Sequence, residues 1–260
     1  MQVSQGSSSR VRVSEMVTAE ERDRVEHFET AYNAIKEELA RLTGKPEKIS
    51  LKELVAALGR ERKRWRQSEG AQLLELGELR NLLVHDRNEP YEYLMVPTTL
   101  AVERIERILG HLRDPLRISR ALPNREVVTL APISSVANAI RMVADYGYSQ
   151  FPVYHEGKFV GLITTSRFAH WLAVHLTPEG SLTDLNGLTV ADVLAEERTS
   201  SYDFISPNET VEEVIEQFSA RPRLRCLLVT YDGTPAGELR QIVTRYDVAG
   251  LLRLLAEQGA

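Results

Sequence analysis

The first apolar stripe of the chain has helical spacing. From Val25 onward, large hydrophobic residues recur at alternating steps of three and four positions, which places them on one face of an α-helix. Thr18 and Glu21 have the spacing of a capping box at the start of this helix, and Gly44 marks its end. Residues 1–17 are short of large apolar groups and contain a Gly-Ser-Ser-Ser stretch, so we predict a flexible tail there.

Three more amphipathic segments follow the first helix. Ser50 with Glu53 begins a second predicted helix, a third runs from about Ala71 to His85, and a fourth runs from Pro97 to Leu112. Each carries an apolar stripe that can be buried against the others. Residues 18–116 are therefore predicted to form an α-helical bundle of four helices.

The pattern changes after about residue 115. Short β-branched or apolar runs now alternate with helical segments, and the order strand, helix, strand, turn, strand, helix occurs twice. The first copy spans about 125–175, a linker spans 176–200, and the second copy spans about 201–257. Neither copy could bury both faces of so small a sheet alone, so we predict one α+β domain, 117–260, in which the two sheets pack together.

The two copies can be aligned residue by residue. An offset of 75 residues pairs the strand at 151–153 with the strand at 226–228. The second copy then has five extra residues in the turn at Asp232, where a hairpin tolerates added length, and Thr164 pairs with Thr244 beyond it.

The two copies read VVTLAPISSVANAIRMVADYGYSQFPVYHEGKFVGLITTSRF and YDFISPNETVEEVIEQFSARPRLRCLLVTYDGTPAGELRQIVTRYDV. Both resemble the repeats of the CBS family, and the resemblance covers more than half of the chain. It implies a disc-like pair of repeats whose clefts hold adenosine-containing ligands such as AMP, ADP or ATP. In that family a Thr-x-x-Asp motif binds ribose and phosphate.

The second copy has this motif as Thr244-Arg245-Tyr246-Asp247. The Asp247 carboxylate can accept hydrogen bonds from both ribose hydroxyls, while the Thr244 hydroxyl and a helix amino terminus can donate to a phosphate. Arg245 would add positive charge. The alternative is that Thr244 only caps the next helix, with Asp247 as the acid of a capping box.

The first copy departs from the motif. It has Thr164, but Arg167 stands where the ribose-binding acid belongs, and arginine cannot accept a hydrogen bond from a hydroxyl. Arg167 could instead pair with a phosphate of a longer nucleotide in the neighbouring cleft. We therefore expect one competent cleft, in the second copy, with Phe204 and Ile205 as candidate walls for the base. An apolar pair on a strand can equally belong to the core.

The third predicted helix carries a second motif, Arg80, Asn81 and His85. It resembles the HEPN family, four-helix domains of which many cleave RNA without a metal through Arg-x(4 to 6)-His, often with asparagine after the arginine. At about 100° per residue, Asn81 and His85 share a helix face while Arg80 points elsewhere. The resemblance therefore implies a homodimer in which two such motifs meet around one cleft.

In that interpretation each residue of the motif has a role in RNA cleavage. His85 handles the proton of a ribose 2′-hydroxyl, Arg80 stabilises the charge on the phosphoryl oxygens, and Asn81 holds the geometry. The alternative is structural: Arg80 pairs with Glu75 or Glu78 on the surface, and His85 caps the end of the helix.

A basic run precedes this helix and surrounds one tryptophan. Such a run suits an RNA backbone with a stacked base, although it can also be a solvated helix face. Its members are Arg60, Arg62, Lys63, Arg64, Trp65 and Arg66.

Composition narrows the remaining function classes. A net charge of −5 argues against wholesale attraction to nucleic acid, and no DNA partner is expected. Cys226, the single cysteine, lies in an apolar run and is expected to be a buried strand residue in a reducing compartment. No run reaches the roughly 20 apolar residues of a membrane helix, so a cytoplasmic protein without membrane contact is expected. No His or Cys pair has metal-ligand spacing, and no cofactor is required.

Two hypotheses from different classes follow. In the first, the protein is a homodimer in which an adenine nucleotide in the second-copy cleft regulates a helical domain that binds or cleaves RNA as a metal-independent endoribonuclease. In the second, the protein is a non-enzymatic nucleotide sensor whose helical domain only dimerises or docks a partner protein.

Overall fold

The computed structural model of the 260-residue chain describes residues 17–85, 95–123, 125–175, 185, 187–195 and 201–259. The chain divides into two compact units, with the boundary between Pro115 and Leu116. The predicted tail 1–17 lies outside the described residues except for its last position, and so does most of the predicted linker 176–200.

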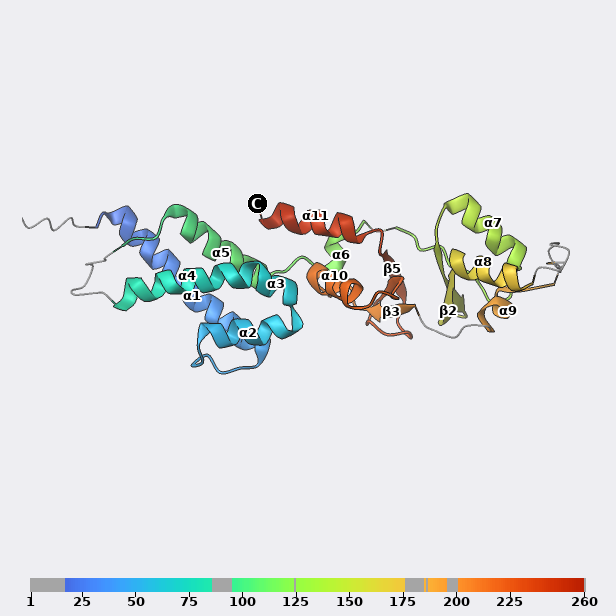
Figure 1. The fold of residues 1–260 in the computed structure, drawn as a ribbon, viewed down its shortest axis with the longest axis horizontal. Coiled ribbons are helices and arrows are strands. Elements are labelled where there is room, and N and C mark those ends of the chain that lie inside the picture. Colours follow the sequence, from blue (N-terminus) through green and yellow to red (C-terminus); the bar gives the residue numbers. More distant parts are fainter. Residues whose placement is uncertain are drawn as a thin grey trace, which may run out of the picture. The chain divides into compact units, whose positions relative to one another are not determined.

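The first unit consists of helices in the part of the chain that is described (Figure 1). Four long helices were expected from the hydrophobic pattern, and a short additional one, α3, follows α2 because the backbone leaves helical geometry at Arg62. The helices are α1 (Ala19–Thr43), α2 (Leu51–Glu61), α3 (Lys63–Gln67), α4 (Glu69–His85) and α5 (Thr99–Arg113).

Two capping boxes fix where α1 and α2 begin. The Glu21 amide donates to Oγ1 of Thr18 at 3.2 Å, and the Glu21 carboxylate accepts from the Thr18 amide at 2.8 Å. Ser50 and Glu53 make the same reciprocal pair at 3.2 and 3.0 Å. Each box satisfies amides that have no partner inside the helix, so both predicted helix starts are confirmed.

The core of the first unit lies between α1, α2, α4 and α5. Phe28, Ile35 and Leu39 of α1 are fully buried, and they share one cluster with Ile105 of α5 and Leu73 of α4. These positions are the apolar stripes that the sequence pattern identified. Burying each large aliphatic or aromatic side chain contributes about 1.5–3 kcal/mol, so the stripes hold the helices together.

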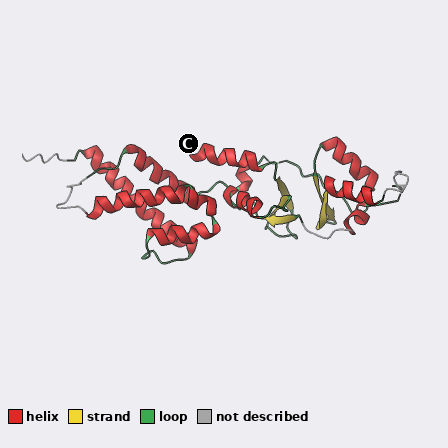
Figure 2. Cartoon of the chain, viewed as in Figure 1, coloured by secondary structure: helices red, strands yellow, loops and turns green. Residues whose placement is uncertain are grey.

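The second unit contains all the strands that are described, as Figure 2 shows. Short helices and strands alternate along it. They are α6 (Ile118–Ala121), α7 (Val136–Tyr146), β1 (Gln150–His155), β2 (Lys158–Thr164), α8 (Thr165–Val174), α9 (Val190–Ala195), β3 (Tyr202–Ile205), α10 (Val211–Ala220), β4 (Cys226–Thr230), β5 (Leu239–Thr244) and α11 (Val248–Gly259).

The strands form two small sheets with matching topology. β1 and β2 are antiparallel, and Leu130 adds a parallel bridge to Val153 at the edge of this pair. In the other sheet β3 lies parallel to β4, and β5 lies antiparallel to β4. Leu130 therefore occupies the place of β3, and the two copies share the order that the internal repeat predicted.

Strand pairing corrects the predicted alignment by one residue. Gln150 lies opposite Thr164, and Cys226 lies opposite Thr244, so Gln150 and not Phe151 is the equivalent of Cys226. The loop before β4 is therefore one residue longer than its counterpart, and the hairpin insertion has four residues instead of five. The difference matters because a one-residue shift in a strand exchanges its two faces.

Each copy has its own hydrophobic core, and a third cluster joins the two sheets. Val153 and Trp171 belong to the core of the first copy, whereas Leu227 and Val229 belong to that of the second. Alternate residues of β4 point the other way. The cluster between the sheets contains the buried Leu162, Cys226 and Leu228, together with the half-buried Phe159, Tyr202, Phe204, Leu239 and Ile242. Burial there raises the pKa of Cys226 to about 12, so its thiol stays protonated.

Thr210, which caps α10, provides a test of this architecture. It is buried, its Oγ1 accepts from the Glu213 amide at 3.2 Å, and its amide donates to the Glu213 carboxylate at 2.9 Å. We expect Thr210→Ala to lower the free energy of unfolding by about 1–2 kcal/mol, because a cap is lost. Thr210→Ser should keep most of the stability. Urea unfolding followed by circular dichroism measures both, and equal stability of Thr210→Ala and wild type would contradict the assigned role.

Candidate functional site

A cavity of about 490 Å³ opens within the second unit. Three chain segments that are distant in sequence line it: residues 122, 123 and 125–128 at the start of the first copy, the turn 146–150 between α7 and β1, and the stretch 241–247 at the end of β5. The first copy thus faces the last strand of the second copy across this space. Its volume lies in the range of small-molecule pockets, about 300–1,000 Å³.

Thr244 and Asp247 lie together on the wall of this cavity. The Thr244 amide and hydroxyl both donate to Oδ2 of Asp247, at 2.7 and 2.8 Å. No described residue donates to the other oxygen, Oδ1. A capping box would make the same two hydrogen bonds within the turn. The bonds also orient the Asp247 carboxylate. The two roles are compatible, because the cavity wall and the turn before α11 share the same residues.

The remaining walls combine apolar and aromatic residues with the polar Arg125, Glu126, Ser149, Gln150 and Gln241. Val127, Val128 and Ile242 line the cavity, and so do Tyr146 and Tyr148, whose rings are stacked with centroids 5.7 Å apart and planes inclined by 19°. The sequence did not predict these wall residues, because the predicted walls, Phe204 and Ile205, were chosen from the copy that contains Thr244. A signal was present in the two tyrosines that flank a glycine between a helix and a strand.

The predicted walls Phe204 and Ile205 are not part of the cavity. Phe204 packs edge-on against Phe159, with ring centroids 5.0 Å apart, inside the cluster between the sheets. Ile205 is 3% exposed and belongs to the core of the second copy. The prediction of base-binding walls was therefore wrong, and the core alternative holds for both residues.

Arg245 does not direct its charge into the cavity. Its Nε donates to the Leu224 carbonyl at 2.8 Å, and its Nη2 donates to the carbonyls of Arg221 at 2.7 Å and Phe218 at 3.1 Å. The guanidinium also lies over the Phe218 ring, 5.7 Å from its centroid. Arg245 therefore satisfies carbonyls at the carboxyl end of α10, where a positive charge is favoured by the helix dipole.

The corresponding arginine of the first copy has a similar structural role. Arg167 donates from Nε to the Val193 carbonyl at 3.1 Å and from Nη2 to the Leu194 carbonyl at 3.5 Å, near the end of α9. Thr164 caps α8, since its Oγ1 accepts from the Arg167 amide at 3.1 Å. Neither residue lines the cavity that contains Asp247.

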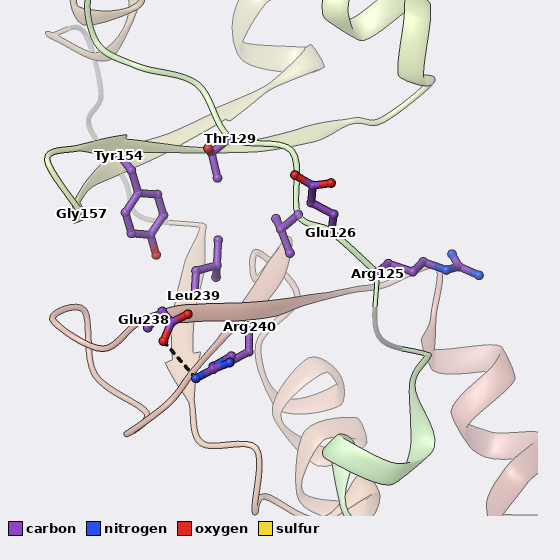
Figure 3. A pocket seen from close by; sticks show the side chains of 9 residues that line it. Arg125, Glu126, Thr129, Tyr154, Gly157, Glu238, Leu239 and Arg240 are labelled. Carbon is purple, nitrogen blue, oxygen red and sulfur yellow. Dashed lines mark hydrogen bonds and ion pairs between the residues drawn. The ribbon is translucent and has the colours of Figure 1, made fainter.

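A second cavity, of about 540 Å³, lies beside residues 125–127 (Figure 3). Residues 125–127 line both cavities. The Tyr154 hydroxyl is buried there without a hydrogen-bond partner in the described chain, and burial raises the pKa of Tyr154. Glu238 and Arg240 form an ion pair at 2.9 Å on the opposite wall, as the dashed line in Figure 3 marks. Glu126, which lines both cavities, is exposed.

The motif of the helical unit lies on the last turns of α4. Arg80 is half-buried and places its guanidinium over the Tyr32 ring, 5.3 Å from the centroid. Arg80 forms no ion pair with Glu75 or Glu78 in the described structure. The alternative of a surface ion pair therefore does not explain its position. Asn81 is exposed, and His85 ends α4 with its side chain outside the described part of the chain.

The basic run before α4 has its charges exposed but its aromatic ring buried. Trp65 is 2% exposed and packs into the core of the helical unit, beside Val55 and against Gly70. The expected stacking of an RNA base on Trp65 is therefore wrong, because a ring in the core has no open face. The exposed members of the run are Arg60, Lys63, Arg64 and Arg66, while Arg62 is half-buried.

The described residues lack two kinds of feature. No helix among them is both long enough and apolar enough to cross a bilayer. Nor do they contain a cluster of three or more His, Cys, Asp or Glu side chains suited to a metal ion.

The assigned role of Arg245 can be tested by stability alone. Arg245→Ala should lower the free energy of unfolding by about 1–3 kcal/mol, because three carbonyls lose a charged donor. Arg253→Ala, which removes an exposed arginine from α11, is the matched control and should be neutral. Thermal and urea unfolding of both variants measure the difference. A neutral Arg245→Ala would mean that its guanidinium is free for another role.

Several solved structures are similar to the second unit in fold. The crystal structure of CBSX2 in complex with AMP is 18% identical, with a TM-score of 0.41, and the match covers 56% of this chain and 99% of that one. The CBS domain of a bacterial CNNM/CorC family Mg²⁺ transporter in complex with ATP is 21% identical, with a TM-score of 0.41 and coverage of 57% and 94%. The AcuB protein from Vibrio cholerae is 14% identical, with a TM-score of 0.42 and coverage of 55% and 95%.

The family comparison identifies the same part of the chain. No curated protein matches the sequence. Two segments, 118–174 and 190–254, match the family described as CBS domain, and each contains the strands of one copy. The second half of this chain is therefore a pair of CBS domains.

Proposed function

We propose that the cleft with Thr244 and Asp247 binds an adenine nucleotide and that the protein responds to its concentration. The observation that carries this proposal is the Asp247 carboxylate, which lines a 490 Å³ cavity and is oriented by Thr244 through one oxygen only. A carboxylate with one open oxygen beside apolar walls suits a group that has vicinal hydroxyls next to a planar base.

Each part of a nucleotide has a candidate partner in the cleft. The ribose hydroxyls donate to Asp247, and the base lies against Val127, Val128 and Ile242. Arg125 lines the same cavity, is exposed, and has no ion-pair partner among the described residues, so its guanidinium is available to a phosphate. AMP, ADP and ATP all satisfy these requirements.

Removal of the Asp247 carboxylate tests this assignment. Asp247→Ala should weaken binding of AMP, ADP and ATP by about tenfold or more, because hydrogen bonds to a charged group contribute about 1.5–3 kcal/mol each. Glu257→Gln, on the exposed side of α11, removes the same charge elsewhere and should bind as wild type does. Isothermal titration calorimetry measures all three proteins.

Two results would count against the proposal in different ways. If Asp247→Ala binds every nucleotide as tightly as wild type, the ligand occupies another cleft. If wild type binds neither adenine mononucleotides nor cyclic dinucleotides, the protein is not a sensor of this class.

For the helical unit we propose metal-independent RNA cleavage by a homodimer, with Arg80, Asn81 and His85 as the motif. The position of Arg80 supports a role in catalysis more than a structural role in a surface ion pair. The Tyr32 ring holds the guanidinium, which has no carboxylate partner among the described residues. Such a group can stabilise negative charge on a phosphate. The exposed basic residues of α2 and α3 would contact the backbone, without a stacked base.

The second candidate function is a non-enzymatic sensor that binds the nucleotide in the same cleft. In it, the helical unit dimerises or docks a partner protein, and the nucleotide regulates that contact. Both versions place the protein in the cytoplasm. They differ on whether the His85 side chain takes part in chemistry.

Cleavage assays on a labelled RNA panel with EDTA separate the two functions. Under the first, wild type cuts RNA, His85→Ala loses cleavage while it keeps its fold and RNA binding, and AMP or ATP changes the rate. The control is His27→Ala, which replaces an exposed histidine of α1, and this variant should cleave RNA as wild type does. No cleavage by wild type would leave a helical unit that works by contact alone.

A further inference from the structure

One glutamine on the wall of the 490 Å³ cavity is held by the main chain of another wall. Gln241 of β5 donates from Nε2 to the Leu122 carbonyl at 3.4 Å and to the Pro123 carbonyl at 3.5 Å. All three residues line the cavity. At these lengths the two bonds contribute little to stability, but they determine which way the amide group points.

Only one end of the Gln241 amide is engaged. A glutamine side chain has a donor end, Nε2, and an acceptor end, Oε1. The reversed orientation would place Oε1 against two carbonyl oxygens that repel it, so Nε2 faces Leu122 and Pro123. No described residue donates to Oε1. The cavity wall therefore carries one acceptor that is oriented and unused.

This acceptor lies beside the surface that we assign to the base. Ile242 follows Gln241 in β5, and strand alternation directs the two side chains to opposite faces of the sheet. Both nevertheless line the cavity, which is possible because β5 is an edge strand of its sheet. Asp247 lines the same cavity beyond the end of the strand. A nucleoside whose ribose is bound by Asp247 thus has its base near Gln241.

The first copy has no such group at the equivalent position. Thr164 pairs with Gln150 and Thr244 pairs with Cys226, so Gly161 is the equivalent of Gln241. A Cβ atom at Gly161 would lie 2.8 Å from the Leu194 side chain, so any larger residue there would require Leu194 to move. The acceptor is therefore particular to the cavity that contains Asp247.

An acceptor at this place distinguishes two kinds of purine. Adenine has a 6-amino group, which donates hydrogen bonds, whereas guanine and hypoxanthine have a 6-oxo group, which only accepts them. Two acceptors that face each other repel, and both lose the hydrogen bonds that they made with water. A site built to hydrogen-bond one group of its ligand rejects an analogue that lacks this group more strongly than an apolar wall does.

We propose that Gln241 determines the base selectivity of this cavity, because its Oε1 accepts a hydrogen bond from a 6-amino purine and disfavours a 6-oxo purine. The apolar walls Val127, Val128 and Ile242 contact either base and do not distinguish them. This inference rests on the proposed nucleotide function and adds to it the residue that selects the base.

Calorimetry with paired nucleotides tests the proposal. AMP and IMP differ in the group at the 6-position of the base, and so do ATP and ITP. We expect wild type to bind the 6-amino member of a pair about tenfold more tightly than the 6-oxo member, because leaving a half-buried acceptor unpaired has an effect of that size. Gln241→Met keeps the length of the side chain without the amide and should reduce this preference to within about twofold.

Two more variants separate base selection from packing. Gln241→Gly copies the residue of the first copy and should also abolish the preference. Gln72→Met makes the same substitution at an exposed position of α4 and should discriminate as wild type does. Because Gln241 is half-buried on an edge strand, both of its variants should remain folded, and thermal unfolding measures this.

Each contrary result has its own meaning. If wild type binds AMP and IMP equally, no group distinguishes the two bases, and the inference is wrong while the proposed function stands. If Gln241→Met weakens both members of a pair equally, the glutamine only positions Leu122 and Pro123, and the inference is again wrong. If the preference persists in Gln241→Met, another residue selects the base. If no nucleotide binds at all, the proposed function itself is wrong, and the inference with it.

Discussion

The contact between the two sheets determines where a ligand can bind to this protein. Leu162 of the first copy packs with Cys226 and Leu228 of the second, and this apolar contact removes the exposed face of both small sheets from water. Because the sheets meet there, the turn after α7 and the end of β5 face one cavity. The cavity is a consequence of the repeat packing, and neither copy contains it alone.

The polar residues around the cleft divide into structural and available groups. Arg167 and Arg245 are charged, but each guanidinium donates to main-chain carbonyls near a helix end. Asp247 is the opposite case, since its neighbour Thr244 bonds to one carboxylate oxygen and leaves the other. Arg125 also lacks an ion-pair partner in the described chain. A binding site needs such incompletely satisfied groups, whereas the stability of the fold is served by satisfied ones.

The same distinction applies to the helical unit. Trp65 and Arg80 both looked available in the sequence, yet Trp65 fills the core and Arg80 rests on the Tyr32 ring. For Trp65 this removes a binding role, because both faces of the indole are covered. For Arg80 it has the contrary effect, since a cation on an aromatic face is positioned while its hydrogen-bond donors remain usable.

The sequence by itself determined the helix starts, the internal repeat and the Thr244 to Asp247 motif, because capping boxes, periodicity and a four-residue turn depend on neighbours along the chain. Only the tertiary structure decided the strand alignment to the residue, the burial of Trp65 and Ile205, the packing of Phe204 between the sheets, and the positions of Tyr146 and Val127 on the cavity wall. These features depend on contacts between segments about a hundred residues apart in the chain, such as 122–128 and 241–247. Local residue patterns carry no information on which distant segment will cover a given side chain, so packing decides which groups are buried and which stay open to a ligand.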